Sequence, residues 1–141
     1  MTLPMDASEL VPHGEPARMV RRLVVCGESD GMAVARIGAD HPLARPDGTA
    51  EGAGLFELLA QTYAAAGGYR SLHGAEPILE GFLVSVDRFE LHAPVPVETD
   101  LQISVRRLEV VAECHIIEGE ISVDGERLAE GKLKLWIRGP S

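Results

Sequence analysis

The sequence predicts an α+β domain in which one long helix is wrapped by a curved, largely antiparallel sheet of about five to six strands. Two observations predict this class: a single strong helical segment lies among several extended segments, and that helix is rich in glycine and alanine. A slim helix lets a strongly curved sheet close around it. With 141 residues, 45% of them hydrophobic, the chain is expected to form one domain over 1–141.

The charge balance excludes several classes of protein. The chain has 13 basic and 22 acidic side chains, a net charge of −9, and a pI near 4.9. Nucleic-acid and anionic-membrane binders need a basic surface, so neither partner is expected. No apolar run approaches the ~18 residues of a membrane span, and the first residues lack a signal-peptide pattern, so we expect a cytoplasmic protein. Its two cysteines are then expected to be free thiols, with no disulfide and no zinc site.

The first half of the chain predicts a hairpin followed by the helix. Residues 1–11 are expected to form a flexible or draped N-terminal arm. Segments 19–26 and 32–37 predict two strands, and Ser29-Asp30-Gly31 predicts the turn between them. After a proline-rich loop, residues 51–66 predict the helix, which Gly67-Gly68 is expected to end.

The second half of the chain predicts only strands. Segments 78–91 and 101–105 read as strands, the second with apolar and polar residues in alternation. Segments 114–123 and 127–137 flank Asp124-Gly125, the strongest hairpin signal in the chain. In the last strand, the apolar residues Leu133, Leu135 and Ile137 are expected on one face, and Lys132, Lys134 and Trp136 on the other.

Glu57 is the candidate acid of the helix, and Gln61 lies four residues later on the same face. Burying an ionised carboxylate costs free energy and favours its protonated form, which suits a general acid or base. The alternative is a solvated Glu57 at a wetter end of the helix. Gln61 is expected either to hold the carboxyl group by a hydrogen bond or to be solvated itself.

Five histidines offer groups that titrate near neutral pH. His41 lies in the loop that leads into the helix, and His13 precedes the first strand, where the chain can cover a pocket mouth. For both, the alternative to catalysis is a turn or capping contact. His115 is expected to be structural or exposed within a strand, and no role is assigned to His73 or His92.

Other motifs are weaker. The glycines of 51–54 match no phosphate-binding loop, but backbone amides at a helix N-terminus can polarise a carbonyl oxygen. No GxSxG motif supports a serine nucleophile. Arg18, Arg21 and Arg22 are expected to form either an ordinary solvated surface or a basic patch for an acidic or phosphorylated partner.

Three segments resemble the 3-hydroxyacyl-(acyl-carrier-protein) dehydratases of the hot-dog fold, and within them the divergent branch associated with aryl-polyene and similar polyketide-like pathways. Residues 11–24 are similar to the opening "PHR.PM…DRV" segment of that family. Residues 54–61 are similar to its central-helix motif "G…E..AQ", and residues 81–86 to its "GFL" strand. The three segments occur in the family's order over nearly the whole chain.

The resemblance implies a homodimer with active sites at the interface and no cofactor beyond the phosphopantetheine arm of the carrier. It implies syn removal of water from a 3-hydroxyacyl thioester to give the 2-enoyl thioester. A histidine removes the C2 proton, an acid on the helix protonates the leaving hydroxyl, and the helix N-terminus polarises the carbonyl. Glu57 matches the acid, and Arg18, Arg21 and Arg22 are the expected carrier patch. The expected substrate-binding residues are Gly54, Leu55, Gln61 and Phe82.

The histidine of the motif does not transfer directly. Main-line dehydratases place it in a "GHFPG" loop 14 residues before the glutamate, and Leu43 occupies that position here. His41 or His13 is then the candidate base, or dehydration is lost. Two alternatives therefore stay open: a hot-dog thioesterase in which Glu57 activates water or attacks the thioester, and a non-catalytic acyl-binding or partner subunit.

Overall fold

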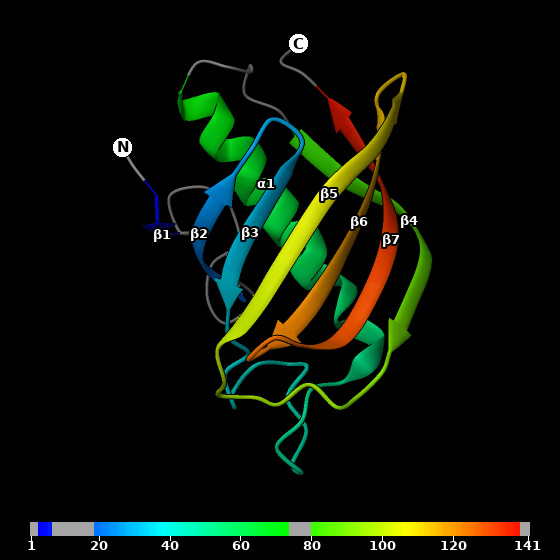
Figure 1. Cartoon of the computed structure of the whole chain (residues 1–141). Coiled ribbons are helices and arrows are strands. Elements are labelled where there is room, and N and C mark those ends of the chain that lie inside the picture. The colour runs from blue at the N-terminus through cyan, green and yellow to red at the C-terminus, as the bar shows by residue number, and fades with distance from the viewer. Residues whose placement is uncertain (1–2, 7–18, 74–79, 139–141) are drawn as a thin grey trace.

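The structure, a computed structural model, describes residues 3–6, 19–73 and 80–138, with side chains not described at 80–82 and 138. One long helix packs against one seven-stranded antiparallel sheet that curves around it (Figure 1). The strand order is β1-β2-β3-β5-β6-β7-β4. The strands are β1 Met5–Asp6, β2 Val20–Cys26, β3 Asp30–Ala35, β4 Glu80–Leu91, β5 Leu101–Val111, β6 Cys114–Val123 and β7 Glu126–Arg138. This confirms the predicted hot-dog architecture.

The strand beyond the predicted five to six comes from the N-terminal arm. Met5 pairs with Leu23, and Asp6 pairs with Arg22, so β1 adds a short edge to the sheet. Met5 is buried. Part of the segment expected to be a flexible or draped arm is therefore a strand.

The β2–β3 hairpin turns earlier than predicted. The backbone N–H of Gly27 donates to the carbonyl of Asp30 at 3.0 Å, which closes the turn over residues 27–29. Asp30 and Gly31, expected in the turn, instead begin β3 and pair with β5. The prediction of Asp30-Gly31 as turn residues was wrong because pairing with β5 extends the strand.

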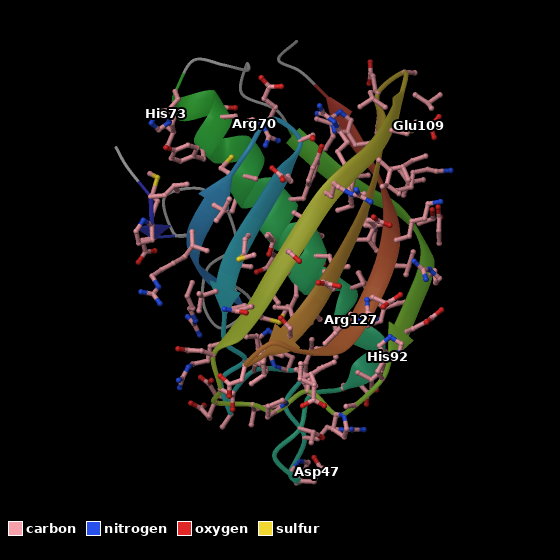
Figure 2. The ribbon with its side chains drawn as sticks, in the orientation of Figure 1. Asp47, Arg70, His73, His92, Glu109 and Arg127 are labelled. Atoms are coloured by element: carbon pink, nitrogen blue, oxygen red, sulfur yellow. The ribbon has the colours of Figure 1, made fainter. Side chains whose placement is uncertain are left out.

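The helical region starts later and ends later than predicted. A short 3-10 helix, η2 Gly52–Gly54, precedes α1 Phe56–Leu72. The expected stop at Gly67-Gly68 was wrong, because packing beyond these glycines stabilises the last turn. Arg70, which is 8% exposed, donates from Nη1 to the carbonyl of Gly27 at 3.1 Å. This contact ties the end of α1 to the β2–β3 turn (Figure 2).

The helix approaches the sheet closely where the strands carry glycine. Gly119 of β6 pairs with Gly131 of β7, and both face Leu59 of α1. A Cβ at Gly119 would lie 2.9 Å from Leu59 Cδ2, and a Cβ at Gly131 would lie 3.5 Å from Leu59 Cδ1. The small residues expected on the helix are thus matched by small residues on the sheet.

The hairpin predicted at Asp124-Gly125 is confirmed, and it joins β6 to β7. Asp124 and Gly125 both have positive φ, 51° and 82°, as the two central residues of a type I′ turn require. In β7, Leu133 and Leu135 are buried, whereas Trp136 is 40% exposed. In the part of the chain that the structure describes, no helix has the length and apolar character needed to cross a membrane.

Candidate functional site

An apolar pocket of about 370 Å³ lies between the start of the helical region and strand β4. Its two walls come from segments far apart in the sequence. Six residues line it: Gly52, Ala53, Phe56, Val86, Phe89 and Leu91. Because β4 is the last strand in the sheet, one of its edges has no neighbouring strand among the described residues. The pocket therefore borders the last strand of the sheet.

Two irregularities in β4 supply the apolar wall of this pocket. The pairing of β4 with β7 shifts between Leu83 and Ser85, and again between Val86 and Arg88. Each shift adds one residue to β4 and resets which side chains face α1. Val86 and Phe89 therefore share the inner face although they are three residues apart. A regular strand would alternate strictly and put Asp87 on that face instead.

Two glycines make room for the pocket side chains. A Cβ at Gly131 would lie 2.7 Å from Phe89 Cδ2, so the Phe89 ring rests on the backbone of β7. A Cβ at Gly52 would lie 3.1 Å from Leu91 Cδ2. The pocket walls depend on the absence of side chains at these two positions.

Glu57 lies in the first turn of α1, directly after the pocket residue Phe56. Its side chain is half-buried. This degree of exposure lies between the two alternatives that the sequence left open, a buried acid and a solvated residue. A carboxylate in the first turn is also favoured by the partial positive charge of the helix N-terminus. The candidate acid is therefore at the end of the helix that borders the pocket.

Gln61 is buried, 1% exposed, and it holds the start of β2. Its Oε1 accepts hydrogen bonds from the backbone N–H groups of Met19 at 2.9 Å and Val20 at 3.2 Å. Gln61 lies one helical turn after Glu57. It therefore fixes the point at which the N-terminal part of the chain reaches the helix face that carries Glu57.

His41 is 8% exposed and makes a turn contact. Its Nδ1 accepts a hydrogen bond from the backbone N–H of Leu43 at 3.0 Å. A neutral imidazole that accepts at Nδ1 carries its proton on Nε2, so Nε2 can donate but has no lone pair to accept a proton. This is the turn contact that the sequence offered as the alternative to catalysis at His41.

The remaining predicted substrate residues are placed as follows. Gly54 is covered by Leu43, since a Cβ at Gly54 would lie 2.4 Å from Leu43 Cδ2. Leu55 is fully buried in the core. Phe82 lies in β4 opposite Trp136, and its side chain is outside the described residues. The residues that line the pocket beside the predicted Glu57 are therefore mainly ones that the sequence did not single out.

Two of the three arginines of the predicted carrier patch, Arg21 and Arg22, lie within the described residues. The pairing of β2 with β3 shifts at Arg21, so Val20 and Leu23 both face the core. Arg21 is half-buried and Arg22 is exposed. The bulge thus keeps both arginines out of the core. Arg18 and His13 lie outside the described residues.

The other described histidines each contact another side chain. His115 Nδ1 lies 2.6 Å from the hydroxyl of Tyr63 on α1, a contact the sequence did not suggest. His73 stacks on Tyr69 at the C-terminal end of α1, with ring centroids 4.2 Å apart (Figure 2). His92 Nε2 lies 3.3 Å from Glu130 Oε2. None of the four histidines in the described ranges lines the apolar pocket.

A cluster of charges surrounds Glu130 on β7. The hydrogen bond from His92, with the charges of Arg127 and Arg88, holds the pKa of the Glu130 carboxyl below its usual value of 4.5. Glu90, His92 and Glu130 bring three potential metal ligands within 4.8 Å of one another. The guanidinium groups of Arg88 and Arg127 both contact Glu130, so they compete with a cation there. The cluster is an ion-pair network.

Comparison with known proteins agrees with this architecture. The model of the ApeP-like family, described as ApeP dehydratase, matches residues 5–138. No curated protein sequence matches the chain. Among solved structures, the dehydratase heterocomplex ApeI:P from Xenorhabdus doucetiae has a TM-score of 0.83 at 20% identity, covering 100% of this chain and 93% of that chain.

Two further solved structures share the fold at lower similarity. The Escherichia coli PaaI protein, from the phenylacetic acid degradation operon, has a TM-score of 0.64 at 13% identity, covering 81% of this chain and 80% of that chain. A mutant hypothetical thioesterase from Streptococcus pneumoniae has a TM-score of 0.64 at 13% identity, covering 84% of this chain and 89% of that chain. At these identities the likeness concerns the fold alone.

Proposed function

Because the chain belongs to the ApeP-like dehydratase family, we propose that it removes water from a 3-hydroxyacyl thioester carried on acyl carrier protein. The product is the 2-enoyl thioester, in fatty-acid or polyketide-like (aryl-polyene-type) synthesis in the cytoplasm. The observation that carries the proposal is the apolar pocket beside the helix end that bears Glu57. An acyl chain needs an apolar wall, and the departing hydroxyl needs a nearby acid.

In the proposed reaction Glu57 is the general acid. A base takes one proton from C2, the electron pair forms the C2=C3 double bond, and the C3–O bond breaks. The Glu57 carboxyl gives its proton to the departing hydroxyl, which leaves as water. The base then returns its proton to Glu57 through solvent, so the enzyme is regenerated.

His13 is the base that we favour. The hydrogen bond from Leu43 uses the Nδ1 lone pair of His41, which leaves the neutral ring unable to accept a proton at Nε2. Gln61, which lies one helical turn after Glu57, holds Met19 by a hydrogen bond. Met19 follows His13 by six residues in the sequence. An extended chain spans ~3.3 Å per residue, so the six residues between His13 and Met19 are a long enough tether for the proposed role.

The start of the helix is proposed to polarise the thioester carbonyl. Leu55 is the N-cap of α1, and no side chain caps it by a hydrogen bond. Backbone N–H groups of an uncapped first turn attract the negative charge that develops on the thioester oxygen. The thioester carbonyl then lies beside the acyl pocket, because Phe56 belongs to the first turn of α1 and also lines the pocket.

The carrier protein is proposed to dock on the basic patch of Arg18, Arg21 and Arg22. Carrier proteins of this kind present a phosphate-bearing arm, which arginine recognises well. The net charge of −9 repels an acidic partner elsewhere on the surface. The bulge at Arg21 supports the patch, because it keeps two consecutive arginines away from the core.

A second subunit is proposed to pair with the free edge of β4. Leu83 and Val84 of this strand are 41% and 55% exposed, as expected for a surface that another chain covers. The sequence predicts a homodimer, whereas the Xenorhabdus doucetiae structure is a heterocomplex. Light scattering of the purified chain, alone and with the subunits that co-purify with it, distinguishes the two assemblies.

One assay separates dehydration from the alternatives. The full chain, with any subunit that co-purifies with it, is incubated with a 3-hydroxyacyl thioester of its carrier protein, and the products are identified by mass spectrometry. Dehydration gives the enoyl thioester, 18 Da lighter by loss of water. Thioester hydrolysis gives free acid and thiol, and a non-catalytic acyl-binding subunit gives no change.

A further inference from the structure

The outer face of the sheet, which points away from α1, carries a groove that runs across the strands. Figure 1 views the sheet from this side, with α1 behind the strands. The groove has a volume of about 380 Å³, and residues from β2 to β7 line it. Gly31, Gly119 and Gly131 supply its floor, because a Cβ at each of them would point toward α1 and leave bare backbone on the outer side.

The pairing of the strands places outward side chains in two rows, one on each side of the groove floor. The first, which we call the basic row, runs in sheet order through Asp30, Arg106, Glu118, Lys132 and Arg88. The second, which we call the acidic row, runs through Met32, Ser104, Glu120, Glu130 and Glu90. The two sides of the groove therefore differ in charge.

At the β7–β4 end of the face, each row keeps like charges side by side. In the basic row Lys132 pairs with Arg88, and in the acidic row Glu130 pairs with both Glu120 and Glu90. Like charges at opposite positions of neighbouring strands destabilise a sheet. Exchanging the charges of Arg88 and Glu90 would remove two of these contacts, so the stability of the single chain does not explain the arrangement.

Two positive charges on this face have no acid bound to them. Lys132 and Lys134 are the two lysines of the chain, and both face outward on β7 because Leu133 between them is buried. Arg88 and Arg127 each contact Glu130. Within the described ranges, by contrast, no acid forms an ion pair with either lysine.

From these features we propose that two copies of this chain pack with their outer sheet faces together, around a twofold axis that runs along the groove. Rotation about this axis places each basic row over the acidic row of the other copy. Lys132 then lies opposite the partner's Glu130, and Arg88 lies opposite the partner's Glu90. Each contact occurs twice, because a twofold interface uses the same surface of both chains.

One position of the two rows brings acids together, and arginines already neutralise it. Glu118 lies opposite the partner's Glu120 in this arrangement. Within each chain Arg106 binds Glu118, and Arg127 binds Glu120. Opposite charges therefore meet on β7 and β4, and neutralised pairs meet on β6.

The charge balance of the face favours a second copy over an acidic partner. Around the groove, basic and acidic side chains are equal in number: Arg88, Arg106, Arg127, Lys132 and Lys134 against Asp30, Glu90, Glu118, Glu120 and Glu130. The net charge of −9 therefore lies on the rest of the chain, where two copies repel each other. An acidic carrier protein would meet the acidic row, whereas a second copy presents both signs in matching order.

The face is large enough for an interface of ordinary size. Five strands spaced ~4.8 Å apart, with ~3.3 Å per residue over about nine residues, cover roughly 700 Å² per copy. A standard interface buries ~800 Å² per partner. Val25, which is 49% exposed, and Met32 add apolar contact at the β2–β3 end. Pairing at the edge of β4 would extend the sheet in its plane, so it leaves this face open.

Sedimentation velocity of the full chain over a range of concentrations measures the association. We expect the mass to double with concentration, more readily at about 0.05 M salt than at about 1 M. K132E places a carboxylate opposite the partner's Glu130 and should raise the dissociation constant about tenfold or more. R36E is the matched control, because Arg36 lies outside the two rows, where it binds Asp100, and its reversal changes the net charge equally.

A charge exchange within one chain tests the order of the two rows. R88E alone should weaken the association in the same direction as K132E. R88E/E90R restores opposite charges across the twofold axis and keeps the net charge at −9. Its dissociation constant should return to within about threefold of that of the unsubstituted chain. Thermal midpoints establish that each variant is folded.

Several results would overturn the inference. They are a single-chain mass at every concentration, equal effects of K132E and R36E, and no recovery in R88E/E90R. A doubling that survives K132E assigns the association to another surface, such as the edge of β4, and a doubling that needs the carrier protein assigns the face to that protein. Lys132 lies outside the apolar pocket, so dehydration by K132E is expected to be unchanged and tests the proposed function separately.

Discussion

The side chain of Leu43 lies against Gly54, so that a Cβ on Gly54 would be 2.4 Å from Leu43 Cδ2. The backbone carbonyl of Leu43 also accepts a hydrogen bond from the N–H of Glu51 at 2.7 Å. Main-line dehydratases have a histidine at the Leu43 position. This chain uses the position for an apolar contact that fixes the loop against the start of the helix, so in the proposed reaction the base is another residue.

The contact predicts that Gly54→Ala destabilises the protein. The added methyl group would force Leu43 out of its position, at a cost of about 1–2 kcal/mol. We expect the thermal midpoint to fall by about 2–6 °C in a calorimetric scan. Gly67→Ala is the control, because a Cβ at Gly67 meets nothing within 4 Å, and alanine favours the helix interior. A Gly54→Ala midpoint equal to that of the unsubstituted chain would show that Leu43 is not held there.

Gln61→Leu is expected to destabilise the protein by about 2–4 kcal/mol. The substitution removes the acceptor of the Met19 and Val20 N–H groups, which would then be buried without a partner. Urea unfolding measures the loss. Gln102→Leu, on the exposed face of β5, is the control and should change the free energy of unfolding by less than about 0.5 kcal/mol. A similar small change for Gln61→Leu would rule out the anchoring role.

The two candidate bases are expected to respond differently to substitution. His41→Ala should lower stability through loss of its turn contact, with little effect on the dehydration rate once the protein is folded. His13→Ala should lower the rate on the order of a hundredfold, as for loss of a general base. Steady-state kinetics at one temperature, together with thermal midpoints, separates the two effects. Equal, mild rate losses in both variants would mean that neither histidine is the base.

The charges around Glu130 predict a pH-dependent contribution to stability. Its pKa is below 4.5 in the folded protein, so the folded state favours the ionised carboxyl. The contribution is present above the unfolded pKa and disappears as the pH falls through the lowered folded pKa. Glu130→Gln should therefore lower the urea midpoint at about pH 6, and this effect should shrink as the pH is lowered further and further below 4.5. A difference that persists undiminished at the lower pH would contradict this assignment.

Much of the fold follows from local patterns in the sequence. The β6–β7 hairpin was predicted because Asp124 and Gly125 tolerate the positive φ that a two-residue turn needs. The alternation in β7 predicted the buried face of Leu133 and Leu135. These features depend on residues close together in the chain.

Features that depend on tertiary contacts were not predictable in the same way. The helix continues through Gly67-Gly68 because Arg70 bonds to Gly27, which lies 43 residues away in the chain. The pocket wall depends on two pairing shifts in β4 that place Val86 and Phe89 on one face. Periodicity assigns those residues to opposite faces, whereas Leu55 and Phe82 were expected from the family resemblance.

The central claim, that Glu57 protonates the departing hydroxyl, is tested most directly by the dehydration rate of Glu57→Gln. The substrate is a 3-hydroxyacyl thioester of the carrier protein, and Glu109→Gln, at the exposed far end of β5 (Figure 2), is the matched control. The account predicts a loss on the order of a hundredfold or more in enoyl formation for Glu57→Gln and none for Glu109→Gln. An unchanged rate in Glu57→Gln would contradict it.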